Sequence, residues 1–125
     1  MRHFCFTAQA LTAALLPAFP SRAFQTVTYP GPTGVTLTAI VDSGPQSGPR
    51  PAVIALHGCG GLGSKNDALG ARHDEWRQRL VDQGYLVIFP DSFGSRGLGG
   101  QCRTTDRTVR ASVERADDVR ATLAI

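Results

Sequence analysis

The sequence predicts an α/β fold, and two observations carry this prediction. Two short apolar runs, Pro51–Leu56 and Tyr85–Phe89, are continuous rather than alternating, which is typical of parallel strands buried on both faces. A segment of helical periodicity lies between them and another follows, so the expected order of elements is β-β-β-α-β-α, with a parallel pair at the centre of the sheet. The sequence shows no internal repeat, and its 125 residues are enough for one domain at most.

Two β-rich segments come before the parallel strands. Gln25–Tyr29 and Val35–Val41 are separated by the turn signals Pro30-Gly31-Pro32 and Gly34, which indicates an antiparallel pair. The stretch Asp42–Pro49 is rich in Ser, Gly and Pro, and we expect it to be a loop. The parallel strands are therefore expected to follow an N-terminal β-hairpin.

The first helix is expected over Ala68–Gln83. Gly84 follows it at the position where a glycine commonly ends a helix. His73 is expected to be a half-buried packing residue. The helical spacing predicts a buried face that comprises Leu69, Trp76 and Leu80.

A second helix is expected after a Gly-rich loop over 91–100. Thr105 or Asp106 can serve as its N-cap. Asp117 and Asp118 are expected at its surface, with Arg115 and Arg120 available to pair with them. The apolar residues that recur at helical spacing are Val109, Val113, Ala116 and Leu123.

The chain ends at Ile125 within this amphipathic segment. No C-terminal cap and no following strand are present, although a helix of this kind normally leads to a further strand. A sheet with only two central strands is marginal and leaves one edge unpaired. We therefore expect the chain to be truncated.

The first 23 residues are typical of an export signal. Arg2 gives a positive start, Phe4–Phe19 is largely apolar, and Ser21-Arg22-Ala23 offers a cleavage site. A membrane anchor is not expected, because Pro17 and Pro20 interrupt the apolar run well short of a bilayer span. We expect a periplasmic or secreted protein whose mature domain is 24–125, with no membrane association after cleavage.

The charge balance argues against a dedicated nucleic-acid-binding surface. The chain carries 13 Lys and Arg against 10 Asp and Glu, a formal net charge of +3, but Arg2 and Arg22 lie in the expected signal. The remaining residues show no cluster of basic side chains, and their net charge is +1 (11 positive against 10 negative).

Two of the three cysteines remain after the expected loss of Cys5. Cys59 and Cys102 each lie in a loop at the carboxyl end of a predicted parallel strand. Neighbouring strands would bring these loops together, and an oxidising compartment permits a bond. We expect a Cys59–Cys102 disulfide, with two free thiols as the alternative.

A glycine-rich turn, His57-Gly58-Cys59-Gly60-Gly61-Leu62-Gly63, directly follows the first parallel strand. Such a turn lets backbone N–H groups point at a developing negative charge. It is expected to form half of an oxyanion hole, with the N–H of Cys59 as donor and that of Gly60 as second choice. Loops on this edge line the ligand crevice of α/β sheets. The expected pocket residues are His57, Gly58, Asp91, Ser92, Phe93 and Arg96.

We expect specific roles for two of these pocket residues. His57 is expected to shape the turn by hydrogen bonds. Arg96 is expected either to meet an anionic substrate group or to be solvated.

The segments PAVIALHGCGGL, WRQRLVDQGYLVIFPDSFGSRG and RADDVRATLAI follow one another as they do in the first half of a dienelactone hydrolase. The stretch Pro51–Ile125 resembles that family. The resemblance implies a partial α/β-hydrolase fold and hydrolysis of a small-molecule ester or lactone through a Cys or Ser nucleophile. Dienelactone hydrolases carry a glutamate close to the position of His57, so the chain looks closer to exported relatives that bear HGCGG.

No nucleophile elbow, Gly-x-Ser-x-Gly or Gly-x-Cys-x-Gly, occurs in the sequence. Nucleophile, acid and base are therefore expected beyond Ile125, and the chain alone is expected to be inactive. A dyad of Cys59 and His57 is disfavoured, because the sequence shows no third group to orient the histidine.

Two other function classes stay open. Gly58-x-Gly60-x-x-Gly63 fits a dinucleotide-binding fingerprint, although helical periodicity starts only near Ala68 and the next strand-end acid, Asp91, lies 28 residues after Gly63. The other class is an exported binding domain without catalysis. No metal and no cofactor are expected for the hydrolase.

Overall fold

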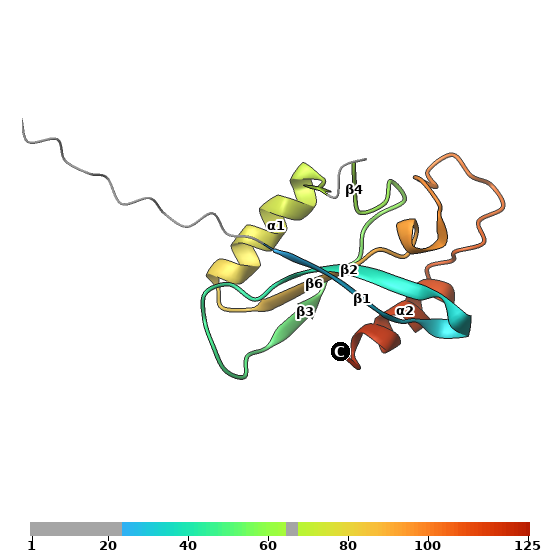
Figure 1. The fold of residues 1–125 in the computed structure, drawn as a ribbon. Coiled ribbons are helices and arrows are strands. Elements are labelled where there is room, and N and C mark those ends of the chain that lie inside the picture. Colours follow the sequence, from blue (N-terminus) through green and yellow to red (C-terminus); the bar gives the residue numbers. More distant parts are fainter. Residues whose placement is uncertain (1–23, 65–67) are drawn as a thin grey trace, which may run out of the picture.

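The computed structural model describes residues 24–64 and 68–125, so the expected export signal at 1–23 lies outside the described residues. These residues form a small α/β fold in which a mixed four-stranded sheet lies between two helices (Figure 1). The strand order in the sheet is β1 (Gln25–Pro30), β2 (Thr36–Asp42), β6 (Leu86–Pro90) and β3 (Ala52–Ile54).

The predicted hairpin is confirmed. β1 and β2 pair antiparallel with Val27 opposite Ala39, and a 3₁₀ turn, η1 (Pro32–Gly34), joins them. β2 then pairs antiparallel with β6, placing Ile40 opposite Phe89. The fourth strand, β3, pairs parallel with β6.

The parallel pair lies at one side of the sheet, and the prediction of a central pair was wrong. β6 is one of the two inner strands and is buried over Val87–Pro90, whereas β3 is an edge strand with partly exposed residues. Leu56, just after β3, is 43% exposed. A continuous apolar run does not distinguish a central strand from an edge strand, because β2 occupies the second side of β6.

The two helices cover opposite faces of the sheet (Figure 1). α1 (Ala71–Asp82) packs through Val81 against the face that carries Val87 and Phe89. α2 (Glu114–Thr122) packs through Ala121 against the face that carries Ile88. Because successive side chains of a strand alternate between faces, β6 contributes to both cores.

A hydrogen bond links the first strand to the last helix. The hydroxyls of Tyr29 and Thr122 lie 2.7 Å apart in the core, although 93 residues separate them in the chain. The Thr122 hydroxyl also donates to the carbonyl of Asp118 at 2.7 Å within α2. Both side chains are buried, so this contact fixes α2 against β1.

α1 begins at Ala71, later than predicted. Residues Ala68–Leu69 form the strand β5, which pairs with β4 (Gly63–Ser64) in a short hairpin, and Gly70 is the helix N-cap. The predicted C-terminal glycine is confirmed, because Gly84 has a φ of 90° and its N–H donates to the Val81 carbonyl at 3.0 Å.

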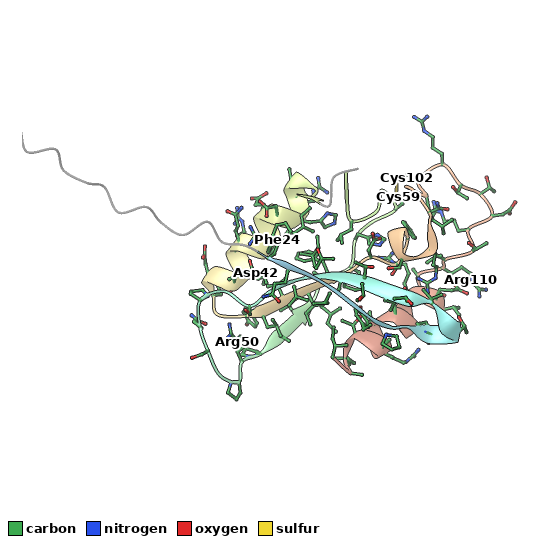
Figure 2. The ribbon with its side chains drawn as sticks, viewed as in Figure 1. Phe24, Asp42, Arg50, Cys59, Cys102 and Arg110 are labelled. Atoms are coloured by element: carbon green, nitrogen blue, oxygen red, sulfur yellow. A yellow bond between two sulfur atoms is a disulfide. The ribbon has the colours of Figure 1, made fainter. Side chains whose placement is uncertain are left out.

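The predicted buried face of α1 was wrong for Trp76, which is 57% exposed. The buried face instead contains Arg77 and Val81, with His73 partly buried one turn earlier and in edge contact with Phe89. The helical spacing did not predict a buried Arg77, because a charged side chain is expected at the surface. Here Asp42 and Asp74 neutralise its charge inside the fold. Figure 2 shows Asp42 and Phe24 beside α1, where the Arg77 guanidinium lies over the Phe24 ring.

α2 begins at Glu114, so the predicted cap at Thr105 or Asp106 was wrong. The segment from 101 to 113 is a series of turns, in which the Nε of Arg107 donates to the carbonyls of Gln101 and Thr104 at 3.0 and 3.2 Å. Val109 is buried from within this loop, while Leu123 is 72% exposed. The segment before Glu114 is therefore a loop held by side-chain bonds, not the predicted first turns of the helix.

Candidate functional site

The candidate site lies where β3 and β6 end. Because these strands are parallel, the turn 57–63 after β3 and the loop 91–102 after β6 emerge at the same edge of the sheet. A disulfide joins Cys59 in the turn to Cys102 in the loop, as expected, and Figure 2 shows the two side chains together. The Gln101 N–H also donates to the Cys59 carbonyl at 2.6 Å.

The loop lies directly against the turn. A Cβ on Gly100 would come within 3.2 Å of the Gly60 carbonyl oxygen, so only a residue without a side chain fits there without displacement. The disulfide, the Gln101 bond and this close approach hold the two segments together. The turn therefore has a fixed backbone next to the loop.

His57 is buried beneath the turn and shapes it by a hydrogen bond, as expected. Its Nδ1 lies 2.8 Å from the Gly58 carbonyl oxygen, and its ring meets Phe93 edge-on with centroids 4.6 Å apart. Burial lowers the pKa of His57 below its usual value, and the positive charge of Arg115 lowers it further. The imidazole is therefore neutral at pH 7, with Nδ1–H donating to Gly58.

Asp91 lies near the second ring nitrogen of His57. Its Oδ1 is 3.7 Å from Nε2, which is beyond hydrogen-bond distance, and Nε2 has no hydrogen-bond partner within the described residues. The dyad of Cys59 and His57 is absent, because the Cys59 sulfur is bonded to Cys102 and the His57 side chain is 0% exposed.

The two candidate oxyanion donors are free. Within residues 24–64 and 68–125, neither the Cys59 N–H nor the Gly60 N–H has a hydrogen-bond acceptor, whereas the Gly61 N–H donates to Gly58 at 3.2 Å and closes the turn. A Cβ on Gly58 or Gly60 would meet no heavy atom within 4 Å, so open space borders the backbone there. Both amides can therefore donate to a bound group.

A hollow of about 190 Å³ lies against this turn. It is walled by the turn glycines together with Asp91, Phe93 and Leu98. Asp91 holds the loop side of this wall, because its Oδ1 accepts the N–H groups of Phe93 and Gly94 at 3.2 and 2.8 Å. These bonds fix the 3₁₀ turn η2 (Gly94–Arg96).

Arg96 is mostly buried and does not line the hollow against the turn. Its guanidinium pairs with both carboxylate oxygens of Asp118 and donates to the Ser92 carbonyl at 2.8 Å. The expectation that Asp118 lies on the helix surface was therefore wrong, because this side chain is 0% exposed. Asp117 does pair with Arg120 as expected. Ser92 is buried, and its hydroxyl has no partner within the described residues.

Arg115 was missed as a site residue. Its Nη2 donates to the His57 carbonyl, and its guanidinium lies over the Phe93 ring at 5.8 Å from the centroid. Since 58 residues separate Arg115 from His57, no local pattern predicts this contact.

The glycine fingerprint has no helix directly after it. The β4–β5 hairpin intervenes, and α1 begins only at Ala71. A pyrophosphate-binding glycine turn opens a helix at once, so that the helix N-terminus faces the phosphates. The described part of the chain also contains no helix long and apolar enough to cross a membrane, and no group of three or more His, Cys, Asp or Glu placed to hold a metal ion.

Comparison with known proteins adds no family assignment. No model of a known protein family matches the chain, and no curated protein matches it either. The likeness to dienelactone hydrolases thus depends on the segments quoted above.

Proposed function

We propose that this chain supplies the oxyanion-binding part of a dienelactone hydrolase-type enzyme, with a partial α/β-hydrolase fold, that acts on ester or lactone bonds. One observation carries the proposal. The amides of Cys59 and Gly60 have no acceptor in the described residues and stand at the carboxyl end of β3, where Gly60 lines the hollow of about 190 Å³.

The chemistry asked of this turn is charge stabilisation. When a nucleophile attacks an ester carbonyl, the carbonyl oxygen becomes an oxyanion, and fixed N–H donors stabilise it more than they stabilise the substrate. One such donor contributes roughly 3 to 4 kcal/mol to the transition state. The disulfide and the His57 bond to Gly58 support the role, because both hold the turn in one conformation.

The proposal places the nucleophile, the acid and the base outside these 125 residues. The sequence has no nucleophile elbow, and Cys59 is occupied by its disulfide. The chain alone is therefore expected to hydrolyse p-nitrophenyl acetate no faster than the buffer does. Turnover that disappears in Cys59→Ser would contradict this assignment and identify a cysteine nucleophile.

A titration with an oxyanion mimic tests the donors directly. The ¹⁵N-labelled chain, oxidised so that the disulfide is intact, is titrated with an alkyl methylphosphonate monoester. We expect the largest amide shifts at Cys59 and Gly60. Gly60→Pro removes one donor and should weaken binding by about tenfold, because a hydrogen bond to a charged group is lost.

Gly60→Ala is the matched control. It keeps the N–H, and its Cβ meets no heavy atom within 4 Å, so binding is expected to change by less than about twofold. Equal losses in Gly60→Pro and Gly60→Ala would refute the amide role. Shifts at Gly58, Gly60 and Gly63 on titration with NADH, but not with the phosphonate, would favour the dinucleotide-binding alternative.

A further inference from the structure

A second hollow, of about 260 Å³, lies on the Arg115 side of Phe93. Three arginines line it, Arg107, Arg110 and Arg115, and the other walls are formed by Phe93, Cys59, Val109 and Ala111. We name it the arginine hollow. Its volume is below the range of pockets for drug-sized ligands, so it suits a small group.

One of the three positive charges is neutralised by the protein. Arg110 pairs with Glu114 at 2.8 Å, and this contact lowers the pKa of Glu114 to about 2. Within the described residues, neither Arg107 nor Arg115 has a carboxylate in ion-pair distance. The arginine hollow therefore has two arginines without an ion-paired carboxylate in the described residues.

Both of these guanidinium groups are held in position with donors to spare. The Nε of Arg107 donates to the carbonyls of Gln101 and Thr104. The terminal N–H groups of Arg107 have no acceptor in the described residues. Arg115 is anchored through Nη2 on the His57 carbonyl and by its contact with the Phe93 ring.

Arg115 also shows what the hollow lacks. Its Nε is buried and has no hydrogen-bond partner within the described chain. Burial lowers the pKa of Arg115 below its usual value, and the negative charge of Asp118 offsets only part of this shift. Buried donors in folded proteins are nearly always paired, so an unpaired one beside a hollow indicates a missing acceptor.

We propose that the arginine hollow binds a phosphate group bridged between Arg107 and Arg115. Two guanidinium groups match the two negative charges and the several acceptor oxygens of a phosphate, which a single carboxylate does not. The group can be inorganic phosphate or the phosphate of a small monoester. This inference does not depend on the proposed hydrolase function, because it uses neither the Gly60 amide nor the Asp91 side of the site.

Calorimetric titration with inorganic phosphate, in a phosphate-free buffer at a constant ionic strength of about 0.15 M, tests the proposal. The oxidised chain should show saturable binding. Arg115→Gln should weaken it by at least about tenfold and Arg107→Gln by about fivefold, since each removes charged hydrogen bonds. Arg120→Gln is the matched control. It removes the same charge from an arginine that is exposed and paired with Asp117, so it should change the affinity by less than about twofold.

Several outcomes would overturn the proposal. They are the absence of saturation, an equal loss in Arg120→Gln, and a phosphate-induced shift at the Gly60 amide in place of the Arg115 Nε resonance. If Arg115→Gln fails to fold by circular dichroism, Arg107→Gln decides alone, because that side chain lies in an exposed loop. Tighter binding of phenyl phosphate than of inorganic phosphate would identify a monoester as the ligand, and equal or weaker binding would identify inorganic phosphate.

Discussion

Arg96 holds both carboxylate oxygens of Asp118, with Nη2 to Oδ1 at 2.7 Å and Nη1 to Oδ2 at 2.9 Å. The aspartate side chain is 0% exposed and the arginine side chain 14%. This two-pronged pair connects the 3₁₀ turn η2, at the wall of the site, to α2 on the far face of the sheet. The position of the site loop is thus coupled to the packing of α2.

Asp118→Asn should destabilise the fold by about 3 to 5 kcal/mol, because it leaves the Arg96 charge buried without its partner. Urea unfolding followed by circular dichroism measures the change. Asp117→Asn is the matched control. Its partner Arg120 is 72% exposed, so the expected loss is about 0 to 1 kcal/mol. Similar losses in both variants would show that the buried pair has no special role.

These neighbouring aspartates also show what the sequence could not predict. Both lie in one amphipathic segment, and nothing local distinguishes the exposed one from the one that reaches Arg96, 22 residues away. The same limit applies to Arg77, which reaches Asp42 over 35 residues, and to Arg115 at the site. Local patterns did predict the hairpin, the buried strand β6 and the Gly84 helix end, because these features depend on neighbouring residues.

The candidate site was predictable in part for the same reason. The position of the glycine turn after a strand, and of Cys59 and Cys102 at one sheet edge, follows from the parallel arrangement of β3 and β6. The contact of His57 with Asp91 depends on how the two loops fold back, and spacing alone does not encode it.

The disulfide should account for a large share of the stability. The bridge spans 43 residues, and removing it in Cys59→Ala/Cys102→Ala should lower the free energy of unfolding by roughly 4 kcal/mol through the entropy of the unfolded chain. Thiol titration in denaturant should detect neither cysteine before reduction and both afterwards. Free thiols at Cys59 and Cys102 in unreduced protein would contradict the bond.

Gly94→Ala should destabilise the wall of the site. A Cβ on Gly94 would overlap the Oδ2 of Asp91, so the Asp91 bonds to the loop amides must shift or break. We expect a loss of about 1 to 3 kcal/mol, seen as a lower thermal midpoint. Gly99→Ala has open space at its Cβ and serves as the control, with an expected change within about 0.5 kcal/mol.

The stability should fall on acidification in a window set by His57. Burial lowers the pKa of His57 in the folded protein below the ordinary value of 6.5, so the unfolded chain binds its proton first as the pH falls. The free energy of unfolding should therefore decrease as the pH falls below about 6.5, by at most about 1.4 kcal/mol per pH unit.

Urea unfolding of the wild type and of His57→Gln, from about pH 7.5 to about pH 5.5, measures this effect. The difference in stability between the two proteins should shrink toward acid. A constant difference would mean that His57 titrates alike in the folded and unfolded chains. Glu114 does not interfere, because its pKa of about 2 lies outside the window.

The Tyr29–Thr122 hydrogen bond has a consequence for the speed of folding. It joins residues 93 apart, and the pairing of β2 with β6 is also distant in sequence, so most of the chain must be ordered before these contacts form. Chains dominated by such distant contacts fold slowly. A disulfide that forms early between Cys59 and Cys102 removes 43 residues from the path between Tyr29 and Thr122, and it lowers the entropy cost of bringing them together. The oxidised chain is therefore expected to refold faster than the reduced one. The Cys59–Cys102 disulfide, which holds the site, should then also increase the rate at which α2 docks against β1.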